Sequence, residues 1–144
     1  MKKVFKGVAA VAVAFAVCVV AGCGAGNSAI EREAQAYADR VLPQICGSWS
    51  SMEIMLQASP EFFASVPGKQ LEQAFSLFKD KLGTLTQYRG SVGKLELRQE
   101  KVVTAIVKAR GAFQKAEGEM TVRVIKRDGV WKIIELNVKS DALH

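Results

Sequence analysis

The hydropathy pattern separates an apolar leader from a longer segment of mixed character. Residues 1–6 are basic, and residues 8–20 form an uncharged apolar run of 13 residues. A membrane-spanning helix needs about 20 apolar residues, whereas a shorter run after a basic start is typical of an export signal. The pattern therefore predicts a helical signal peptide over residues 1–22.

Helical spacing dominates the first half of the remaining chain. Ser28 is predicted to cap a helix whose apolar positions recur every three or four residues, and Pro43 is predicted to end or kink this helix near residue 42. Three further helical segments are predicted: residues 48–58, a short turn that starts at Ser59-Pro60 and ends before Pro67, and residues 68–82, followed by Gly83 as a stop.

From Thr84 onward the apolar positions alternate instead, as they do in strands. Asp128-Gly129 is a strong signal for a tight hairpin, and a phase change in the last run predicts a bulge near residues 134–135. Helices followed by an antiparallel meander indicate the α+β class. We expect one domain over residues 29–144, with N-terminal helices packed on a curved, cone-like antiparallel sheet of about four strands.

The end of the leader, Val20-Ala21-Gly22-Cys23, resembles the lipobox of bacterial lipoproteins. The resemblance implies cleavage between Gly22 and Cys23 and attachment of palmitate-type acyl chains at Cys23. More than one chain is needed because a single acyl chain gives only marginal anchoring. The alternative is an ordinary signal peptide that is cut by a different peptidase.

The resemblance also implies a destination. Gly24 stands where an Asp favours retention in the inner membrane of Gram-negative bacteria, so the resemblance implies an outer-membrane protein that faces the periplasm if the organism is Gram-negative. Residues 23–28 are expected to form the lipidated Cys and a flexible tether. Its five residues after Cys23 reach about 17 Å when extended, so the domain is expected to lie close to the lipid surface.

The order of parts after residue 29 resembles the nuclear-transport-factor-2-like (cystatin-like) fold, and locally the small domains of unknown function within it. Three segments carry the resemblance: residues 58–63, residues 78–83 and residues 128–133. The resemblance implies a cone-shaped α+β domain. It implies no activity, because this fold hosts both enzymes and non-catalytic modules.

Charge and cysteine usage narrow the function classes. Removal of the three leader lysines lowers the net charge from +6 to +3, which does not favour nucleic-acid binding. Cys46 is the single cysteine of the expected domain, so there is no internal disulfide framework. We interpret it as a small buried apolar residue, with a reactive or intermolecular thiol as the alternative.

The sequence offers little catalytic chemistry. The single histidine is the terminal His144, and no metal-ligand spacing, phosphate-binding loop or nucleophile elbow is present. Relatives by fold that isomerise ketosteroids use an Asp and a Tyr, for which Asp39, Tyr37 and Tyr88 are the candidates. We interpret Asp39 as solvated and Tyr37 as core, and we predict no catalytic residues, metal or cofactor.

Two groups of residues are candidates for binding. An open cavity in the cone would be lined first by Trp49, Met55, Phe62 and Tyr88, although a filled aromatic core is the alternative. A basic face would be formed by cations that recur on the predicted strands, with a solvated outer sheet face as the alternative: Lys108, Arg110, Arg123, Arg127 and Lys132.

The sequence therefore predicts a lipid-anchored protein of the bacterial cell envelope, attached to the membrane through Cys23. Its domain is expected to be a non-catalytic binding or assembly-support module. The expected partner is another envelope protein or an anionic surface, and not nucleic acid. The alternative is a small-ligand carrier or a small enzyme that uses the cone cavity.

Overall fold

The computed structural model describes the backbone of residues 14–143 and the side chains of residues 28–143. The chain divides into two compact units, Met1–Ile30 and Glu31–His144. Within the described residues, four α-helices precede four strands, which are followed by a short 3₁₀-helix: α1 (Ala14–Ser48), α2 (Ser51–Gln57), α3 (Pro60–Ser65), α4 (Gly68–Lys81), β2 (Leu85–Arg98), β3 (Val102–Phe113), β4 (Glu117–Arg127), β5 (Val130–Lys139) and η1 (Asp141–Leu143).

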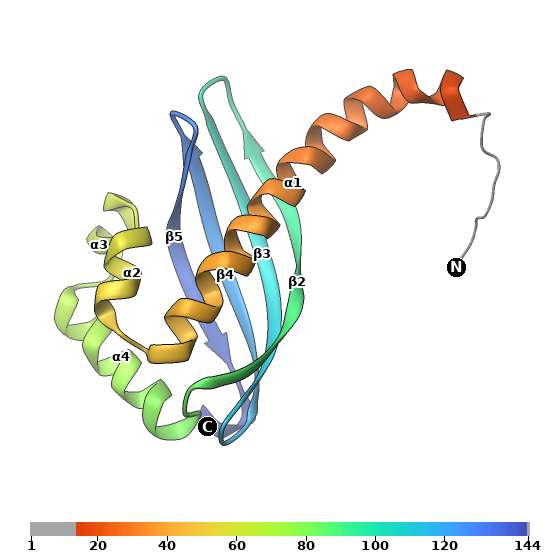
Figure 1. Cartoon of the computed structure of the whole chain (residues 1–144). Coiled ribbons are helices and arrows are strands. Elements are labelled where there is room, and N and C mark those ends of the chain that lie inside the picture. Colours follow the sequence, from red (N-terminus) through yellow and green to blue (C-terminus); the bar gives the residue numbers. More distant parts are fainter. Residues whose placement is uncertain (1–13, 144) are drawn as a thin grey trace. The chain divides into compact units, whose positions relative to one another are not determined.

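The strands form one antiparallel sheet in the order β2-β3-β4-β5, which confirms the α+β class and the meander. Residues 31–48 of α1 lie on the same side of this sheet as α2 and α4 (Figure 1). We call the sheet face toward them the inner face and the opposite one the outer face. The inner side chains of β3 and β4 are buried against the helices: Ala105, Val107, Ala109, Met120, Val122 and Val124.

Helix α3 begins where the sequence places it, whereas α2 begins at Ser51 and not at residue 48, because α1 extends to Ser48. The Ser59 side chain accepts a hydrogen bond from the backbone N–H of Phe62, and Pro60 occupies the first helical position of α3. Gly83 follows α4 with a φ of 75°, a conformation that glycine adopts without strain. The signals at Ser59, Pro60 and Gly83 set the start of α3 and the end of α4, so these two predictions are confirmed.

The β4–β5 hairpin also follows the prediction. Asp128 and Gly129 have φ values of 55° and 79°, as both central residues of a type I′ turn require. Val124 pairs with Ile133 and Arg123 with Glu135, which leaves Ile134 as the extra residue of a bulge. The predicted bulge near residues 134–135 is confirmed.

Helix α1 differs from the prediction at both ends. It continues past Pro43 to Ser48, although proline in a helix interior costs about 3 kcal/mol. Leu42, Ile45 and Cys46 are fully buried on either side of Pro43, and each large apolar side chain contributes about 1.5–3 kcal/mol when buried. Burial of these side chains therefore outweighs the cost of Pro43, and the prediction that the helix ends near residue 42 is wrong.

At its other end, α1 includes Ser28 instead of beginning there, so the predicted cap is wrong. The backbone of residues 24–28 is helical where the sequence predicts a flexible tether. This stretch contains no proline, and extension of an existing helix is much easier than its nucleation.

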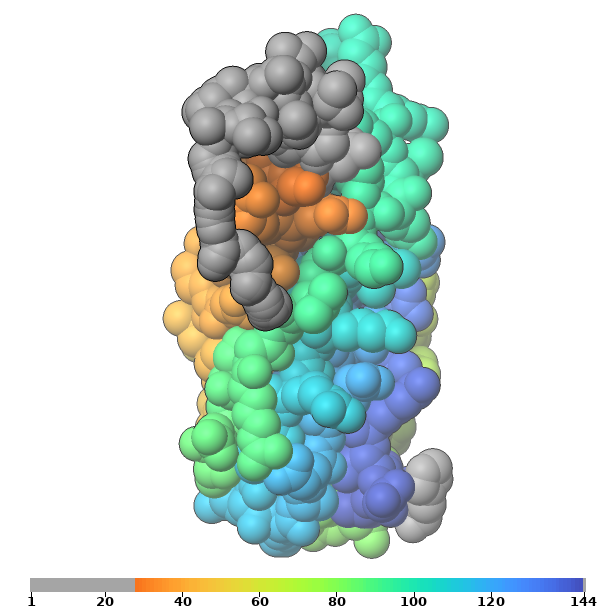
Figure 2. Space-filling view, turned by 90° about the vertical axis from the view of Figure 1, so that its right-hand side faces the viewer, coloured from red at the N-terminus to blue at the C-terminus, as the bar shows by residue number. Residues whose placement is uncertain are grey.

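A row of polar side chains joins α1 to β2. Glu31, Gln35 and Asp39 follow one another at four-residue intervals, which places them on one side of the helix. Glu31 Oε2 accepts the Leu95 N–H at 2.7 Å, Gln35 Oε1 accepts the Gly93 N–H at 3.3 Å, and Asp39 Oδ1 accepts the Ser91 hydroxyl at 2.6 Å. Figure 2 shows β2 in green directly beside α1 in orange. We call these contacts the α1–β2 polar row.

The polar row leaves no space for a side chain at Gly93. A Cβ added there would lie 2.8 Å from the backbone carbonyl oxygen of Glu31. We expect Gly93→Ala to lower the free energy of unfolding by about 1–3 kcal/mol, the usual cost of overpacking. Urea denaturation followed by tryptophan fluorescence measures it.

The matched control is Gly47→Ala near the end of α1, where an added Cβ has no atom within 4 Å. We expect this variant to be unchanged or slightly more stable, because alanine reduces the entropy of the unfolded chain. Equal stability of both variants would contradict the close packing of α1 on β2.

Candidate functional site

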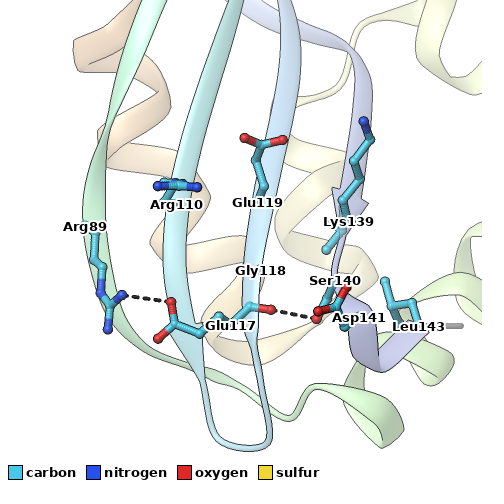
Figure 3. Close-up of a pocket in the computed structure, with 10 residues that line it drawn as sticks. Arg89, Arg110, Glu117, Gly118, Glu119, Lys139, Ser140, Asp141 and Leu143 are labelled. Carbon is cyan, nitrogen blue, oxygen red and sulfur yellow. Dashed lines mark hydrogen bonds and ion pairs between the residues drawn. The ribbon is translucent and has the colours of Figure 1, made fainter.

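The outer face of the sheet carries a row of charged side chains across three strands. Arg110 on β3 pairs in register with Glu119 on β4, which pairs with Lys139 on β5. These positions alternate with buried inner residues, so their side chains point away from the helices. The three side chains lie side by side across the sheet in Figure 3.

This row borders a hollow of about 590 Å³ at one end of the sheet. Arg89 on β2 forms an ion pair with Glu117 at 2.8 Å, and the Ser140 hydroxyl donates to the backbone carbonyl of Glu117 at 2.6 Å. Both contacts fix the rim (Figure 3). The hollow is lined by residues of all four strands and of η1: Arg89, Arg110, Glu117, Gly118, Glu119, Val138, Lys139, Ser140, Asp141 and Leu143.

A smaller hollow of about 370 Å³ adjoins the first and shares Arg89, Arg110 and Glu119 with it. It adds Lys108 from β3 and the edge residues Gly90 to Val92. We call the two together the outer-sheet hollow. Sequence reasoning found Lys108 and Arg110 but missed the residues from β2, β4 and β5. The available signal for Glu119 on β4 was alternation with Met120, and for Lys139 on β5 it was alternation with Val138.

The charges of the outer-sheet hollow are mixed. Within the part of the chain that the structure describes, no ion pair involves Lys108, Arg110 or Lys139. Glu119 and Asp141 likewise have no ion pair there. The site therefore offers three unpaired cations and two unpaired carboxylates, which suits recognition of a polar, charged ligand or partner surface.

The predicted basic face does not form one continuous cationic surface. Arg123 donates to Glu96 at 2.8 Å and reaches Glu135 at 3.4 Å, and Arg127 pairs with Glu61 at 2.5 Å. Arg127 lowers the pKa of Glu61 to about 2 through this hydrogen bond. Arg123 and Arg127 of the predicted face are therefore paired with carboxylates, and only Lys108 and Arg110 belong to the outer-sheet hollow.

Lys132, the fifth residue of that prediction, lies elsewhere. Its Nζ donates to the backbone carbonyl of Leu56 at 3.0 Å, so it joins β5 to the end of α2.

The structure does not bring the four predicted cavity residues together. Trp49 and Phe62 are buried at 5% and 2% exposure, whereas Met55 on α2 is exposed at 56%. Tyr88 is half-buried within β2. None of the four lines the outer-sheet hollow.

Trp49 instead fills the space between helices and sheet. Its ring lies 5.4 Å from Phe75, 5.0 Å from Phe78 and 6.0 Å from Phe113, measured between centroids. Its Nε1–H donates to the Gly83 carbonyl at 2.8 Å. The apolar ring and its polar edge are both satisfied inside the core, which is why Trp49 does not line an open cavity.

Asp39 and Tyr88, two of the three catalytic candidates, do meet. The Tyr88 hydroxyl donates to Asp39 Oδ1 at 2.5 Å, so the interpretation of Asp39 as a freely solvated side chain is wrong. Burial, and then the hydrogen bond with Asp39, raise the pKa of Tyr88. The prediction failed because Asp39 belongs to the α1–β2 polar row, and the periodicity of the helix does not reveal such tertiary contacts.

Tyr37 is a core residue, as predicted. It is 4% exposed, and its hydroxyl donates to Gln57 Oε1 at 2.8 Å. Burial raises its pKa to about 12.

Several predicted features lie outside the described side chains. These are the cleavage site at Gly22 and Cys23, lipidation of Cys23, and His144. Among the described residues, no helix has both the length and the apolar character needed to cross a bilayer. The same residues contain no cluster of three or more His, Cys, Asp or Glu side chains that could hold a metal ion.

Comparison with known proteins adds no relative. No protein family, no curated protein and no solved structure matches the chain.

Cys46 is enclosed by the core. It is fully buried, and its thiol contacts Met120 Sδ at 3.5 Å. Burial raises the pKa of Cys46 to about 12. Because the thiolate is the reactive form, the fold suppresses its chemistry.

We expect Cys46 of the folded full-length chain to be alkylated by iodoacetamide at pH 8 about a thousandfold more slowly than in urea, because fewer thiolates form. Mass spectrometry of the Cys46 peptide measures this. The raised pKa of Cys46 also makes the stability of the fold depend on pH. The contribution of the neutral, buried thiol to the free energy of unfolding is fully present below about pH 9, the ordinary thiol pKa, and is lost as the pH rises toward 12. Equal labelling in the folded and unfolded chain would refute this assignment.

Proposed function

We propose that this protein is a lipid-anchored component of the bacterial cell envelope whose α+β domain binds a partner and performs no catalysis. The anchor is proposed on the lipobox Val20-Ala21-Gly22-Cys23 at the end of an apolar run of signal-peptide length. If the organism is Gram-negative, Gly24 after the lipidated position favours the outer membrane. The order of helices and strands is in keeping with the proposed likeness to nuclear-transport-factor-2-like domains.

The observation that carries the binding role is the contrast between the two sides of the sheet. The inner side is occupied by a core in which Trp49 packs among three phenylalanines. The outer side shows β2 to β5 side by side, with no helix over them among the coloured residues of Figure 2. The outer-sheet hollow lies there, and its unpaired charges suit a polar partner.

A small enzyme or ligand carrier is the second candidate. The hydrogen bond between Tyr88 and Asp39 favours it, because an acidic acceptor and a phenol donor lie together. However, Asp39 Oδ1 also accepts a hydrogen bond from the Ser91 hydroxyl, and Asp39 does not line the outer-sheet hollow. A structural role within the α1–β2 polar row accounts for the same contacts.

The anchor is tested with Cys23→Ser in cells that make the protein. We expect this variant to lose incorporation of labelled palmitate and to leave the membrane fraction, because the acceptor thiol is gone. Cys18→Ser is the matched control, since residue 18 lies in the predicted leader and should not affect the mature product. Retained lipid labelling of Cys23→Ser would refute the anchor.

The binding site is tested by photo-crosslinking in the same cells. A photo-reactive amino acid in place of Lys108, in the outer-sheet hollow, is expected to give a discrete protein adduct. The same amino acid in place of Lys81, exposed in the last turn of α4, is the control and should give none. An identical adduct pattern at both positions, or none at either, would count against the outer face as the binding surface.

A further inference from the structure

Exposed apolar side chains gather on α2 and at the start of β5. Met52, Met55 and Leu56 are 66%, 56% and 61% exposed, and Val130 is 52% exposed. Spacings of three and four residues place the first three on one face of α2, while Ile54 faces the core. Leu56 and Val130 line the same hollow. We call these four residues the apolar patch.

The hollow beside the apolar patch has a volume of about 480 Å³ and contains cations from two elements. Arg40 of α1 lies over the Tyr37 ring, 5.3 Å from its centroid, and Lys132 of β5 donates to the Leu56 carbonyl. Among the described residues, no carboxylate forms an ion pair with either cation.

The carboxylate that lines this hollow, Glu33, is already engaged. It forms an ion pair with Lys126 and accepts the Trp131 Nε1–H at 3.1 Å. The hydrogen bond from Lys126 is the main cause of the lowered pKa of Glu33. The uncompensated charge in this hollow is therefore positive, beside an apolar surface.

Chain length brings this surface near the proposed lipid. Nine residues lie between Cys23 and Glu33, so ten Cα–Cα steps join them, and even a fully extended chain of this length spans only about 35 Å. This limit holds for any placement of residues 1–30. Glu33 therefore cannot lie much farther from the proposed lipid anchor than the thickness of the hydrocarbon core of a bilayer, about 30 Å.

We propose that the apolar patch, with Arg40 and Lys132, is a second membrane-contact site, occupied by the surface of an anionic bilayer. The proposal rests on the lipid anchor proposed above. Apolar side chains enter the boundary between headgroups and acyl chains, and cations bind lipid phosphates. A bilayer is favoured over a protein partner because the anchor holds the lipid within reach, which raises its effective concentration.

The test uses the full-length lipoprotein reconstituted in vesicles of phosphatidylglycerol and phosphatidylcholine, or of phosphatidylcholine alone. A polarity-sensitive fluorophore is attached in the folded state to Met55→Cys or to the control Val92→Cys. Val92 is 62% exposed on β2 and pairs with outward-facing Lys108. Buried Cys46 and acylated Cys23 do not react.

We expect spin-labelled lipids to quench the fluorophore at position 55 at least about twofold more strongly than at position 92, because only the former enters the lipid boundary. The difference should shrink in neutral vesicles and in the Arg40→Gln, Lys132→Gln double variant, which loses the phosphate contacts. Near-UV circular dichroism checks that each variant is folded.

Each other outcome overturns the proposal in a distinguishable way. Equal quenching at both positions on retained protein overturns the contact site and leaves the anchor intact. Loss of the protein from the vesicles together with absence of lipid on Cys23 overturns the anchor as well. A blue shift at position 55 without lipid quenching identifies a protein occupant, and dependence of that shift on protein concentration identifies a second copy of this chain.

Discussion

The α1–β2 polar row depends on a match between two different repeats. Four residues of an α-helix rise about 6 Å, and two residues of a strand rise about 6.6 Å. Glu31, Gln35 and Asp39 therefore reach Leu95, Gly93 and Ser91 in succession, although helix and strand run in opposite directions. The row orients α1 so that its apolar side faces the sheet and its polar side meets β2. Gly93 permits the close approach, and the buried core follows from this orientation.

Much of the fold could be predicted because its signals are local. Ser59-Pro60, Gly83 and Asp128-Gly129 each act through the conformation of one or two residues, which neighbours in sequence largely determine. The course of α1 could not be predicted in this way. Its passage through Pro43 is decided by burial of Leu42, Ile45 and Cys46 in the core, where the Cys46 thiol contacts Met120 of β4, 74 residues later in the chain. The helix propensity of the residues around Pro43 does not include this energy.

The outer face of the sheet shows the same contrast between what local sequence predicts and what tertiary contacts decide. Alternation along a strand predicts that Lys108, Arg110 and Arg123 leave the core on the outer face. It does not predict which of them are neutralised, because Glu96 comes from β2 and Glu135 from β5. Nor does it join Asp39 to Tyr88, which are 49 residues apart. Sequence supplies the chemistry of each strand, whereas register and edge contacts decide which charges stay available.

Both edges of the sheet have polar backbone groups engaged by other elements. On β2, the Gly93 and Leu95 N–H groups are bonded to side chains of α1. On β5, the Ile133 carbonyl accepts the Ser59 N–H, and Ala58 forms a parallel bridge with Ile133. A foreign strand therefore cannot pair with Gly93 and Leu95 of β2 or with Ile133 of β5 unless these bonds break. Recognition through these segments has to proceed by side-chain contact and not by addition of a strand. The same coverage limits edge-to-edge association of protein molecules held close together at one surface.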